Sequence, residues 1–353
     1  MALDLEAKIQ LVKRPPTEEI LVEDELRKLL EEKKHPEHYI GIEISGKLHL
    51  GTLFLNGFKI NDFLKAGFNC KVLLADWHSY INNKLGGDWE RIKKASEYYR
   101  KAFEFFCPGV KTLLGSELYH HNDEYWKDLI RFCKKITLAR NVRCLTIMGR
   151  SEKDKLDFSQ YLYPPMQATD VKYLGKDIAH GGMDQRKVHV LCREVFPKLG
   201  WPKPIAVHHH LLIGLSEPPR AESKEERVIA AKMSKSKPWT CIFIHDSKEE
   251  IRQKLIKAWC PPREAEFNPV LEILKYVIFH EREEFELRRE KKYGGPKRFS
   301  SYEEVERAYR KGEIHPQDLK LSVAEVLDEI VAPIRKFFEK SPNSKLLEIF
   351  EEK

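Results

Sequence analysis

The 353-residue chain is 42% hydrophobic and 33% charged, which provides apolar side chains for a large core and a polar surface around it. No apolar run reaches the length of a membrane-spanning helix, and the first residues (Met-Ala-Leu-Asp-Leu-Glu) do not resemble a signal peptide. The net charge of +7 is modest, and the seven cysteines include no Cys-x-x-Cys pair. This speaks against a zinc ribbon and a disulfide framework, and predicts a reducing, cytoplasmic setting.

Strands that alternate with helices are predicted over about the first 240 residues. Residues 39–44 alternate apolar and polar side chains, and residues 70–76 form an apolar run typical of a buried parallel strand. The other predicted elements are a helical region over 4–34 that is interrupted at Pro15-Pro16 and restarts near Thr17, a helix over about 88–106, a strand over 111–114, a helix from Tyr163, a strand over 177–180, a helix over 184–198 and a strand over 204–209. This alternation predicts an α/β fold with an open, doubly wound, Rossmann-like parallel sheet.

A basic helical insertion without a matching strand is predicted at about 115–160, and a mobile polar loop at 218–240. Basic residues crowd 131–150 and 288–298, which suits a long polyanion bound at two places. Solvated helix faces explain either patch equally well.

The character of the sequence changes at residue 246. Ser247 and Glu250 predict a capping box that opens a helix to about Trp259, and the chain beyond is predicted to be mainly helical. A stripe with helical spacing, with Pro333 inside it to kink or split the helix, is expected to be core: Leu319, Val323, Leu327, Ile330, Ile334 and Phe337. We therefore predict an α/β domain over 1–245 and a helical domain over 246–353.

Two motifs are suited to binding phosphates. After the first strand, a glycine turn at Gly46 and a helix opening at His49 direct free backbone N–H groups and the positive end of a helix dipole toward an anion. His49 and Thr52 add side-chain donors, and Gly51 leaves room for a base or a ribose. The second motif, Lys232-Met-Ser-Lys-Ser236, offers cations and hydroxyls for a leaving pyrophosphate. Either motif taken alone is more often an ordinary loop.

Polar side chains also gather at predicted strand ends. Tyr163, Gln167 and Asp170 share one helix face, and Gln185 follows a strand, as do Asp76, Trp77 and His78, which are expected to point at the same crevice as His49. Such a face is costly to bury unless it forms an internal network or binds a polar ligand.

The pair His49-Leu-Gly-Thr52 and Lys232-Met-Ser-Lys-Ser236 resembles the signature of class I aminoacyl-tRNA synthetases. Together with Tyr39-Ile-Gly-Ile-Glu, Tyr163-Pro-x-Met-Gln-x-x-Asp170 and Gly181-Gly-Met-Asp-Gln-Arg-Lys187, nearly the whole chain is similar to tyrosyl-tRNA synthetases of the archaeal and eukaryotic type. The resemblance implies ATP-dependent ligation of L-tyrosine to tRNA(Tyr) through a tyrosyl-adenylate, with release of AMP and pyrophosphate. It also implies Mg²⁺ on the phosphates, no protein-bound metal, a homodimer built through the insertion, a catalytic domain over 1–245 and an anticodon-binding domain over 246–353.

The resemblance also implies residue roles. For tyrosine, Tyr39 and Asp170 would bind the phenol, and the α-ammonium would be held by Tyr163, Gln167 and Gln185, with Glu43 nearby. For ATP, Gly182 and Asp184 would contact the ribose, His49, Gly51 and Thr52 the phosphate side, and Lys232, Met233, Ser234, Lys235 and Ser236 the pyrophosphate. Catalysis would rest on His49, Thr52, Lys232 and Lys235. For tRNA, Arg140 and Arg143 would meet the acceptor end and His315 and Asp318 the first anticodon base, with Tyr276 or Phe279 stacking on it.

Three alternatives remain open at this level. The sister enzyme, tryptophanyl-tRNA synthetase, shares the fold and both motifs, but is not expected to carry Tyr39 and Asp170. Thr52 stands where the family usually has a second histidine, so a synthetase-like RNA-binding protein without ligase activity is a second reading. A small-molecule nucleotidyltransferase is a third, although it gives no use for His315 and Asp318. The triplet His208-His-His210 alternates faces on a strand, so its side chains are not expected to bind one metal ion.

Overall fold

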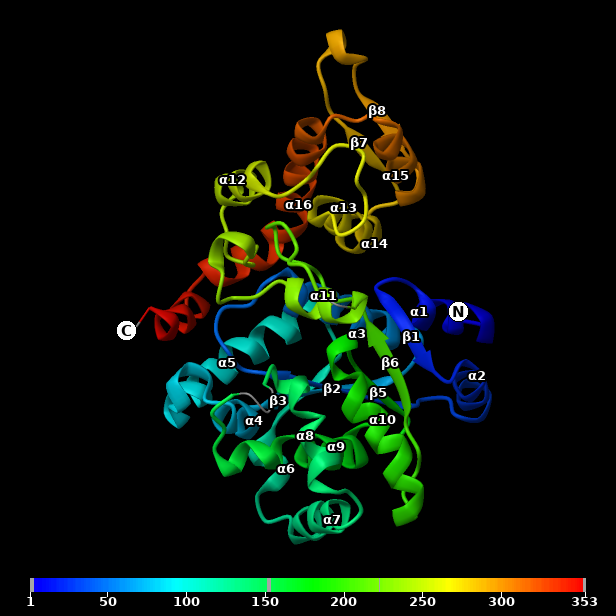
Figure 1. Cartoon of the computed structure of the whole chain (residues 1–353), viewed down its shortest axis with the longest axis vertical. Coiled ribbons are helices and arrows are strands. Elements are labelled where there is room, and N and C mark those ends of the chain that lie inside the picture. Colours follow the sequence, from blue (N-terminus) through cyan, green and yellow to red (C-terminus); the bar gives the residue numbers. More distant parts are fainter. Residues whose placement is uncertain (1–2, 151–153, 222, 352–353) are drawn as a thin grey trace. The chain divides into compact units, whose positions relative to one another are not determined.

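The computed structural model describes residues 3–150, 154–221 and 223–351, which fall into two compact units (Figure 1). The first unit holds Met1–Gly46, Asn56–His210 and Leu346–Lys353, and the second holds Lys47–Leu55 and Leu211–Lys345. This division differs from the single predicted boundary near residue 245. The reason is a backbone pairing between segments far apart in sequence: Leu50 N–H donates to the Ile242 carbonyl at 3.1 Å, and Ile244 N–H to the Leu48 carbonyl at 3.1 Å.

A six-stranded sheet forms the centre of the first unit. Its strands, in spatial order, are β1 (Thr17–Leu21), β6 (Ile205–His209), β5 (Ile178–Gly182), β2 (Glu37–Glu43), β3 (Asn69–Ala75) and β4 (Lys111–Leu114). All neighbours are parallel except the antiparallel pair of β1 and β6. The predicted doubly wound parallel sheet is confirmed. The strand order reverses between β2 and β5, and ligands of such sheets bind beyond the carboxyl ends of the strands at this switch point.

The predicted helix restart at Thr17 is wrong. Residues Thr17–Leu21 form β1, which pairs with the free edge of β6, and the next helix begins only at Glu23. A threonine followed by two glutamates is a good helix start by local preference. Here the unpaired edge of β6 offers backbone partners, and Glu18 and Glu19 accept hydrogen bonds from His210 and His208, which no local pattern reveals.

Helices cover the sheet of the first unit. They are α1 (Leu5–Lys13), α2 (Glu23–Glu32), α3 (Leu55–Lys65), α4 (Asp76–Ile81), α5 (Trp89–Phe106), α6 (Gly115–Tyr119), α7 (Asp123–Cys133), α8 (Leu138–Val142), α9 (Tyr163–Leu174) and α10 (Arg186–Val195). Helix α4, which follows directly after β3, was not predicted. Between β4 and β5 the described residues hold helices and short helical turns without a strand, as predicted. Residues 151–153 of the predicted insertion and residue 222 of the predicted loop lie outside the described residues.

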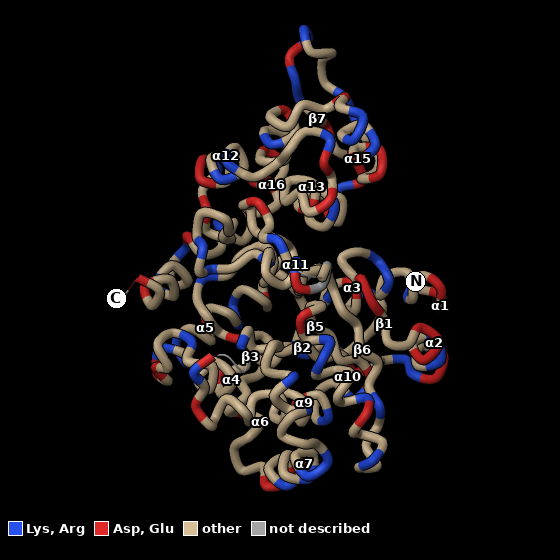
Figure 2. Tube along the Cα trace, viewed as in Figure 1, with Lys and Arg blue, Asp and Glu red and all other residues tan. Residues whose placement is uncertain are grey.

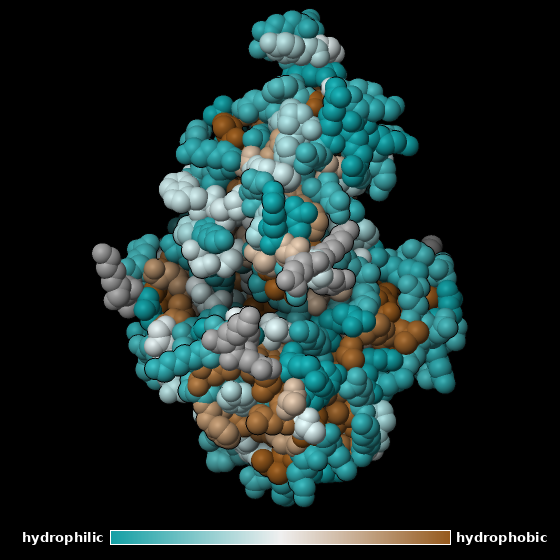
Figure 3. All heavy atoms as spheres, in the orientation of Figure 1, coloured by the Kyte–Doolittle hydropathy of each residue, from teal (hydrophilic) through white to brown (hydrophobic). Residues whose placement is uncertain are grey.

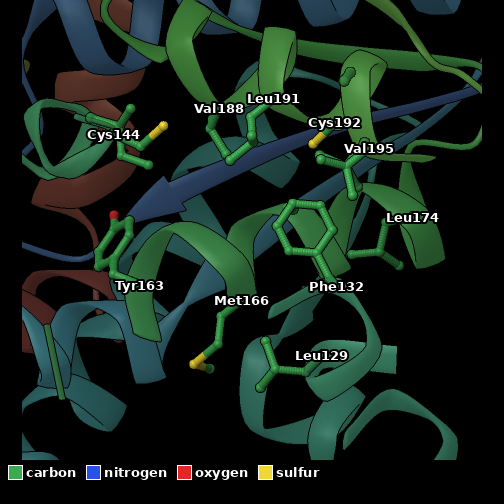
Figure 4. Packing of buried hydrophobic residues seen from close by; sticks show 14 of the residues in the cluster. Leu129, Phe132, Cys144, Tyr163, Met166, Leu174, Val188, Leu191, Cys192 and Val195 are labelled. Atoms are coloured by element: carbon green, nitrogen blue, oxygen red, sulfur yellow. The ribbon is translucent and has the colours of Figure 1, made fainter. Parts of the chain in front are cut away.

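Buried apolar side chains of α7, α9 and α10 meet in one core. Phe132 of α7, Leu174 of α9 and Val195 of α10 are among its members, and Figure 4 shows these side chains directed toward one another. Tyr39 of β2 and Tyr163 of α9 belong to the same cluster. The core therefore fixes two of the predicted site residues by packing.

The histidine triplet of β6 joins two separate buried networks. His208 Nε2 lies 3.0 Å from His189 Nδ1, while His209 Nδ1 lies 2.9 Å from His180 Nε2. His180 continues to His38, with 3.1 Å between Nδ1 and Nε2. The predicted alternation of faces is confirmed. Burial lowers the pKa of His38 and His208 to about 3 and that of His209 to about 4, so these rings are neutral near neutral pH.

The second unit is mainly helical, as predicted. Its helices are α11 (Lys224–Ala231), α12 (Lys248–Lys257), α13 (Pro269–Ile273), α14 (Phe279–Glu281), α15 (Tyr302–Lys311) and α16 (Pro316–Glu339). The predicted capping box of Ser247 and Glu250 is confirmed at the start of α12. An antiparallel pair, β7 (Phe285–Leu287) and β8 (Lys297–Phe299), was not predicted, since strands of three residues carry too little periodicity.

Helix α16 confirms most of the predicted stripe and corrects its end. Leu319, Val323, Leu327 and Ile334 are buried, but the other buried large side chains are Val331 and Phe338 rather than Ile330 and Phe337. Both sets have helical spacing, and packing selects between them. The helix runs through the exposed Pro333 without splitting. Within the described residues, no helix combines the length and apolar character needed to cross a membrane.

Candidate active site

The buried end of the site is a carboxylate surrounded by phenols in the first unit. Asp170 of α9 is 0% exposed and accepts hydrogen bonds from Tyr125 Oη at 2.8 Å and from Tyr119 Oη at 3.0 and 3.1 Å. Burial raises the pKa of Asp170 well above its usual range, and the two phenols oppose that rise. Burial, and then the charge of Asp170, raise the pKa of Tyr39, which is therefore a neutral hydrogen-bond donor.

Two further pairs of predicted residues are joined by hydrogen bonds. Tyr163 Oη donates to Glu43 Oε1 at 3.4 Å, and Gln167 Nε2 donates to Gln185 Oε1 at 3.0 Å. Glu43 ends β2 and Gln185 follows β5, so both stand at the switch point of the sheet. All six residues predicted to bind tyrosine thus belong to the first unit, and hydrogen bonds join four of them in two pairs.

The burial of helix α9 explains how it can carry several of these polar side chains. Pro164 and Pro165 occupy its first turn, where their missing N–H groups leave no hydrogen bond unmade. The helix is buried nearly all round. Its polar side chains are therefore forced into internal partnerships, which the offsets among Tyr163, Gln167 and Asp170 arrange on one face.

Gly41 leaves space for the Tyr39 hydroxyl. A Cβ atom at residue 41 would lie 2.7 Å from Tyr39 Oη, closer than real Cβ atoms come. No hydrogen bond joins the Tyr39 hydroxyl to another described residue, so its donor is available to a ligand.

Three residues near Asp170 were missed or misplaced by sequence reasoning. Tyr119 and Tyr125 lie in the insertion that was assigned to other partners, and no local signal ties them to a helix some 45–51 positions away. His78 was expected to share a crevice with His49, but its Nε2 lies 3.6 Å from Asp170 Oδ2. Burial lowers the pKa of His78 to about 3, so the contact joins a neutral ring to the carboxyl group and is not an ion pair.

The other two residues of that prediction, Asp76 and Trp77, contact neighbouring protein groups. Asp76 accepts hydrogen bonds from the backbone N–H and hydroxyl of Ser116, at 3.0 and 2.5 Å, and so ties the end of β3 to α6. Trp77 is 36% exposed, with its ring 5.2 Å from that of Trp89.

The predicted phosphate-binding residues of the first motif lie in the second unit. His49 precedes a π-helical turn, Leu50–Phe54, that leads into α3, so the predicted helix start is confirmed. His49 Nε2 lies 2.8 Å from Thr52 Oγ1, while its buried Nδ1 has no partner among the described residues. Burial, then Lys235 and Lys232, hold the pKa of His49 well below its usual range. The ring is therefore a neutral hydrogen-bonding group.

Gly51 makes room for a protein group. A Cβ atom there would lie 3.2 Å from His49 Cε1 and 3.3 Å from His49 Nδ1, tighter than ordinary contacts. The space at Gly51, which was predicted to receive a base or a ribose, therefore lies beside the imidazole of His49.

The second motif is attached to the same unit by Met233. Its N–H donates to the Leu212 carbonyl at 2.7 Å, and its side chain is 4% exposed. Ser234 and Ser236 hydroxyls lie 3.0 Å apart, and Lys232 and Lys235 are half-buried. Part of the predicted loop, before the motif, is helix α11. Of the predicted ribose contacts, Gly182 ends β5 and Asp184 follows it in the first unit.

The residues predicted to contact tRNA differ in whether their side chains already bind a neighbouring protein group. Arg140 pairs with Glu194 at 2.9 Å, whereas Arg143 is exposed and forms no ion pair with a described residue. His315 caps α16 by accepting the Gln317 N–H at 3.2 Å, and Asp318 lies in the first turn of α16.

The segment 288–298 carries an exposed aromatic residue that the sequence did not single out. Figure 2 shows acidic residues beside the basic ones of this region, and Arg288 pairs with Glu325 at 2.6 Å. Tyr276 and Phe279, predicted to stack on a base, are half-buried, while Tyr293 between β7 and β8 is 61% exposed. Its flanking Lys291 and Lys292 were noted only as charge.

The family model of class I tRNA synthetases (W and Y) matches residues 31–332. The chain belongs to this family. It is 48% identical over 363 aligned residues to the tyrosine–tRNA ligase of Thermococcus sibiricus, covering 96% of each chain. Class I tRNA synthetases use ATP, which agrees with the two phosphate-suited motifs.

Solved structures of class I tRNA synthetases show the same fold. The tyrosyl-tRNA synthetase of Pyrococcus horikoshii, solved with L-tyrosine, aligns with a TM-score of 0.92 and 47% identity over 99% of this chain and all of that one. The tyrosyl-tRNA synthetase of Aeropyrum pernix aligns with a TM-score of 0.87 and 40% identity over 99% of this chain and all of that one.

Proposed function

We propose that this class I tRNA synthetase ligates L-tyrosine to tRNA(Tyr) at the cost of ATP, through a tyrosyl-adenylate. The observation that carries the proposal is the fully buried Asp170 carboxylate beside the free donor of Tyr39. The similarity to a tyrosyl-tRNA synthetase solved with L-tyrosine supports it.

The specificity follows from desolvation. A tyrosine phenol donates to Asp170 and accepts from Tyr39, so both buried groups are satisfied. Phenylalanine would leave them unpaired away from water, and an unpaired buried polar group costs about 1–3 kcal/mol or more when charged. An indole donor points elsewhere on a larger ring, so tryptophan matches neither the shape nor both partners.

The first chemical step needs no general base, because the amino-acid carboxylate is ionised at neutral pH. It attacks the α-phosphorus of ATP in line, and pyrophosphate leaves. Gln167, Gln185 and Tyr163 would hold the α-ammonium, with the Glu43 carboxylate balancing its charge. Catalysis then consists of alignment and of stabilising the charge that builds on the phosphate oxygens.

The phosphate side falls to the second unit. Lys232 and Lys235 would neutralise the leaving pyrophosphate, with Met233, Ser234 and Ser236 in the same loop. His49 and Thr52 would donate hydrogen bonds as a neutral pair. Because Thr52 cannot carry charge, the lysines supply the cationic part of the stabilisation. Gly182 and Asp184 would contact the ribose.

We propose that Mg²⁺ enters with the ATP phosphates. Among the described residues no group of three or more His, Cys, Asp or Glu side chains is placed to hold a metal ion. Phosphate oxygens and water are the ligands that Mg²⁺ prefers in such sites. It supplies charge neutralisation there, and the residues above do the positioning.

In the second step, a ribose hydroxyl of the terminal adenosine of tRNA attacks the adenylate carbonyl and AMP leaves. We propose that Arg140 and Arg143 meet the acceptor end, and that His315 and Asp318 read the first anticodon base. Tyr293 replaces Tyr276 and Phe279 as the proposed stacking residue, because it alone of the three is well exposed. A stacked base is worth about 1–3 kcal/mol.

We also propose a cytoplasmic homodimer formed through the insertion. Exposed apolar side chains on this segment support it: Trp126, Ile130, Leu138, Phe158 and Leu162. Figure 3 shows apolar side chains gathered at the surface where Figure 1 places α6, α7 and α8. All seven cysteines are free thiols, which suits a reducing compartment.

The test is exchange of labelled pyrophosphate into ATP by the purified chain, without amino acid and with tyrosine, phenylalanine or tryptophan. Tyrosine-dependent exchange, followed by charging of tRNA(Tyr), is expected. Exchange with tryptophan alone would assign the chain to the sister enzyme, and no exchange with any amino acid would leave an RNA-binding protein without ligase activity.

A further inference from the structure

We infer that Tyr119 and Tyr125 are positioning residues for amino-acid specificity: their phenols hold Asp170 as a carboxylate whose free side accepts a substrate hydroxyl. The inference rests on the proposed function and deepens it. It assigns part of the selectivity of the pocket to two helices of the insertion, α6 and α7.

The hydrogen bonds around Asp170 are one-sided. Oδ1 accepts from both Tyr125 and Tyr119, whereas Oδ2 receives only the longer, shared bond from Tyr119 at 3.1 Å. A carboxylate has room for about four hydrogen bonds. The unused capacity therefore lies on Oδ2, on the side where His78 stands 3.6 Å away.

The two phenols are fixed by packing. Tyr119 and Tyr125 are 3% and 0% exposed, with ring centroids 4.6 Å apart. Tyr125 Oη also lies 3.2 Å from the Met166 carbonyl, one turn before Asp170 on α9. A Cβ atom at Gly115 would come within 3.0 Å of the Tyr119 ring, so the chain passes close behind that ring. Neither phenol can turn away without unpacking the core.

The charge of Asp170 depends on these donors. The titratable groups that face it are Tyr39 of β2, His78 and Asp76 of α4, Tyr119 of α6, Tyr125 of α7 and Cys192 of α10. His78 is neutral, and the Asp76 charge raises the pKa of Asp170. The two phenols are the groups that lower it.

Loss of a phenol therefore changes what the pocket rejects. Without it, Asp170 takes up a proton more easily and becomes a neutral acid. A neutral acid left unpaired beside phenylalanine costs less than an unpaired carboxylate, and it is a weaker acceptor for tyrosine. Discrimination between the two amino acids should therefore fall for two reasons: phenylalanine is penalised less, and tyrosine is bound more weakly.

The experiment compares Tyr125→Phe, Tyr119→Phe and the double variant with the wild-type chain. The matched control is Tyr173→Phe, which removes a phenol that donates to Asp128 Oδ2 at 3.0 Å, also from helix α9. Pyrophosphate exchange gives kcat/KM for tyrosine and phenylalanine between about pH 6 and 8.5, and thermal unfolding checks that each variant folds.

We expect the tyrosine-to-phenylalanine ratio of kcat/KM to fall about tenfold in Tyr125→Phe, and less in Tyr119→Phe, whose bond is shared. KM for tyrosine should rise while kcat and KM for ATP stay near wild type. The lost ratio should return as pH rises and Asp170 ionises, which a merely structural role would not produce. Tyr173→Phe should keep the wild-type ratio and profile.

An unchanged ratio in both folded single variants, or a fall that Tyr173→Phe shares, would overturn the inference. So would a fall that is independent of pH. The wild-type chain distinguishes these outcomes from failure of the proposed function. If it shows no tyrosine-dependent exchange of pyrophosphate into ATP, the proposed function is refuted, and the inference with it.

Discussion

Mild acid should destabilise this protein through its buried histidines. Folding holds the pKa of His38, His78 and His208 at about 3 and that of His209 at about 4, against 6.5 for a histidine in water. Their folded pKa values are depressed, so the unfolded chain binds more protons below pH 6.5. Stability is therefore complete above about pH 6.5 and is lost as the pH falls toward the folded values.

The magnitude follows from proton linkage. Between about pH 7 and 5.5 each such histidine destabilises the folded state by roughly 1.2 kcal/mol, so the four together contribute about 5 kcal/mol. The pKa values of His180 and His189 are also held well below the usual range and act in the same direction. The raised pKa of Asp170 acts in the opposite direction. Since whole proteins are stable by about 5–15 kcal/mol, the loss should be large.

The assay is urea unfolding followed by far-UV circular dichroism at several pH values between about 5 and 8. His38→Leu should lower the number of protons taken up on unfolding by about one, because it removes one buried neutral ring. A midpoint that stays constant or rises on acidification to about pH 5.5 would refute the reasoning.

Three further outcomes are expected. Gly41→Ala places a Cβ 2.7 Å from Tyr39 Oη and should raise KM for tyrosine about tenfold in pyrophosphate exchange, with KM for ATP unchanged. Thr52→Val removes the hydroxyl 2.8 Å from His49 Nε2 and should slow adenylate formation about tenfold in single-turnover measurements, while tyrosine affinity holds. Lys254→Met leaves Asp246 buried without its partner at 2.5 Å and should lower stability by about 3–5 kcal/mol, seen as a reduced Tm; an unchanged Tm would contradict the burial argument.

The sequence was sufficient to predict the elements that are determined by neighbouring residues. The alternation of β2, the apolar run of β3 and the capping box of Ser247 each follow from neighbouring residues, and each was predicted. The spacing of Tyr163, Gln167 and Asp170 likewise follows from helix geometry. Of these elements, β2 and α9 carry residues predicted to bind tyrosine.

The missed features depend on partners far away in sequence. Thr17–Leu21 has a helical preference that the edge of β6 overrides. Tyr119 and Tyr125 reach Asp170 only after the insertion packs on α9, and periodicity carries no information about such a contact. The assignment of His49 to the second unit depends on its pairing with Phe243, which sequence spacing does not reveal.

The chain enters the second unit twice, and this has a consequence for truncation and for synthesis. Residues 47–55 are the first, short segment of the second unit. Four of their apolar side chains are fully buried: Leu48, Leu50, Leu53 and Phe54. A fragment ending at residue 210 would lack residues 242–244, whose backbone pairs with Leu48 and Leu50, and a growing polypeptide must keep these apolar side chains shielded until that segment emerges. A premature stop codon or a proteolytic cut between residues 55 and 242 would therefore yield an aggregation-prone fragment instead of a separately folded domain.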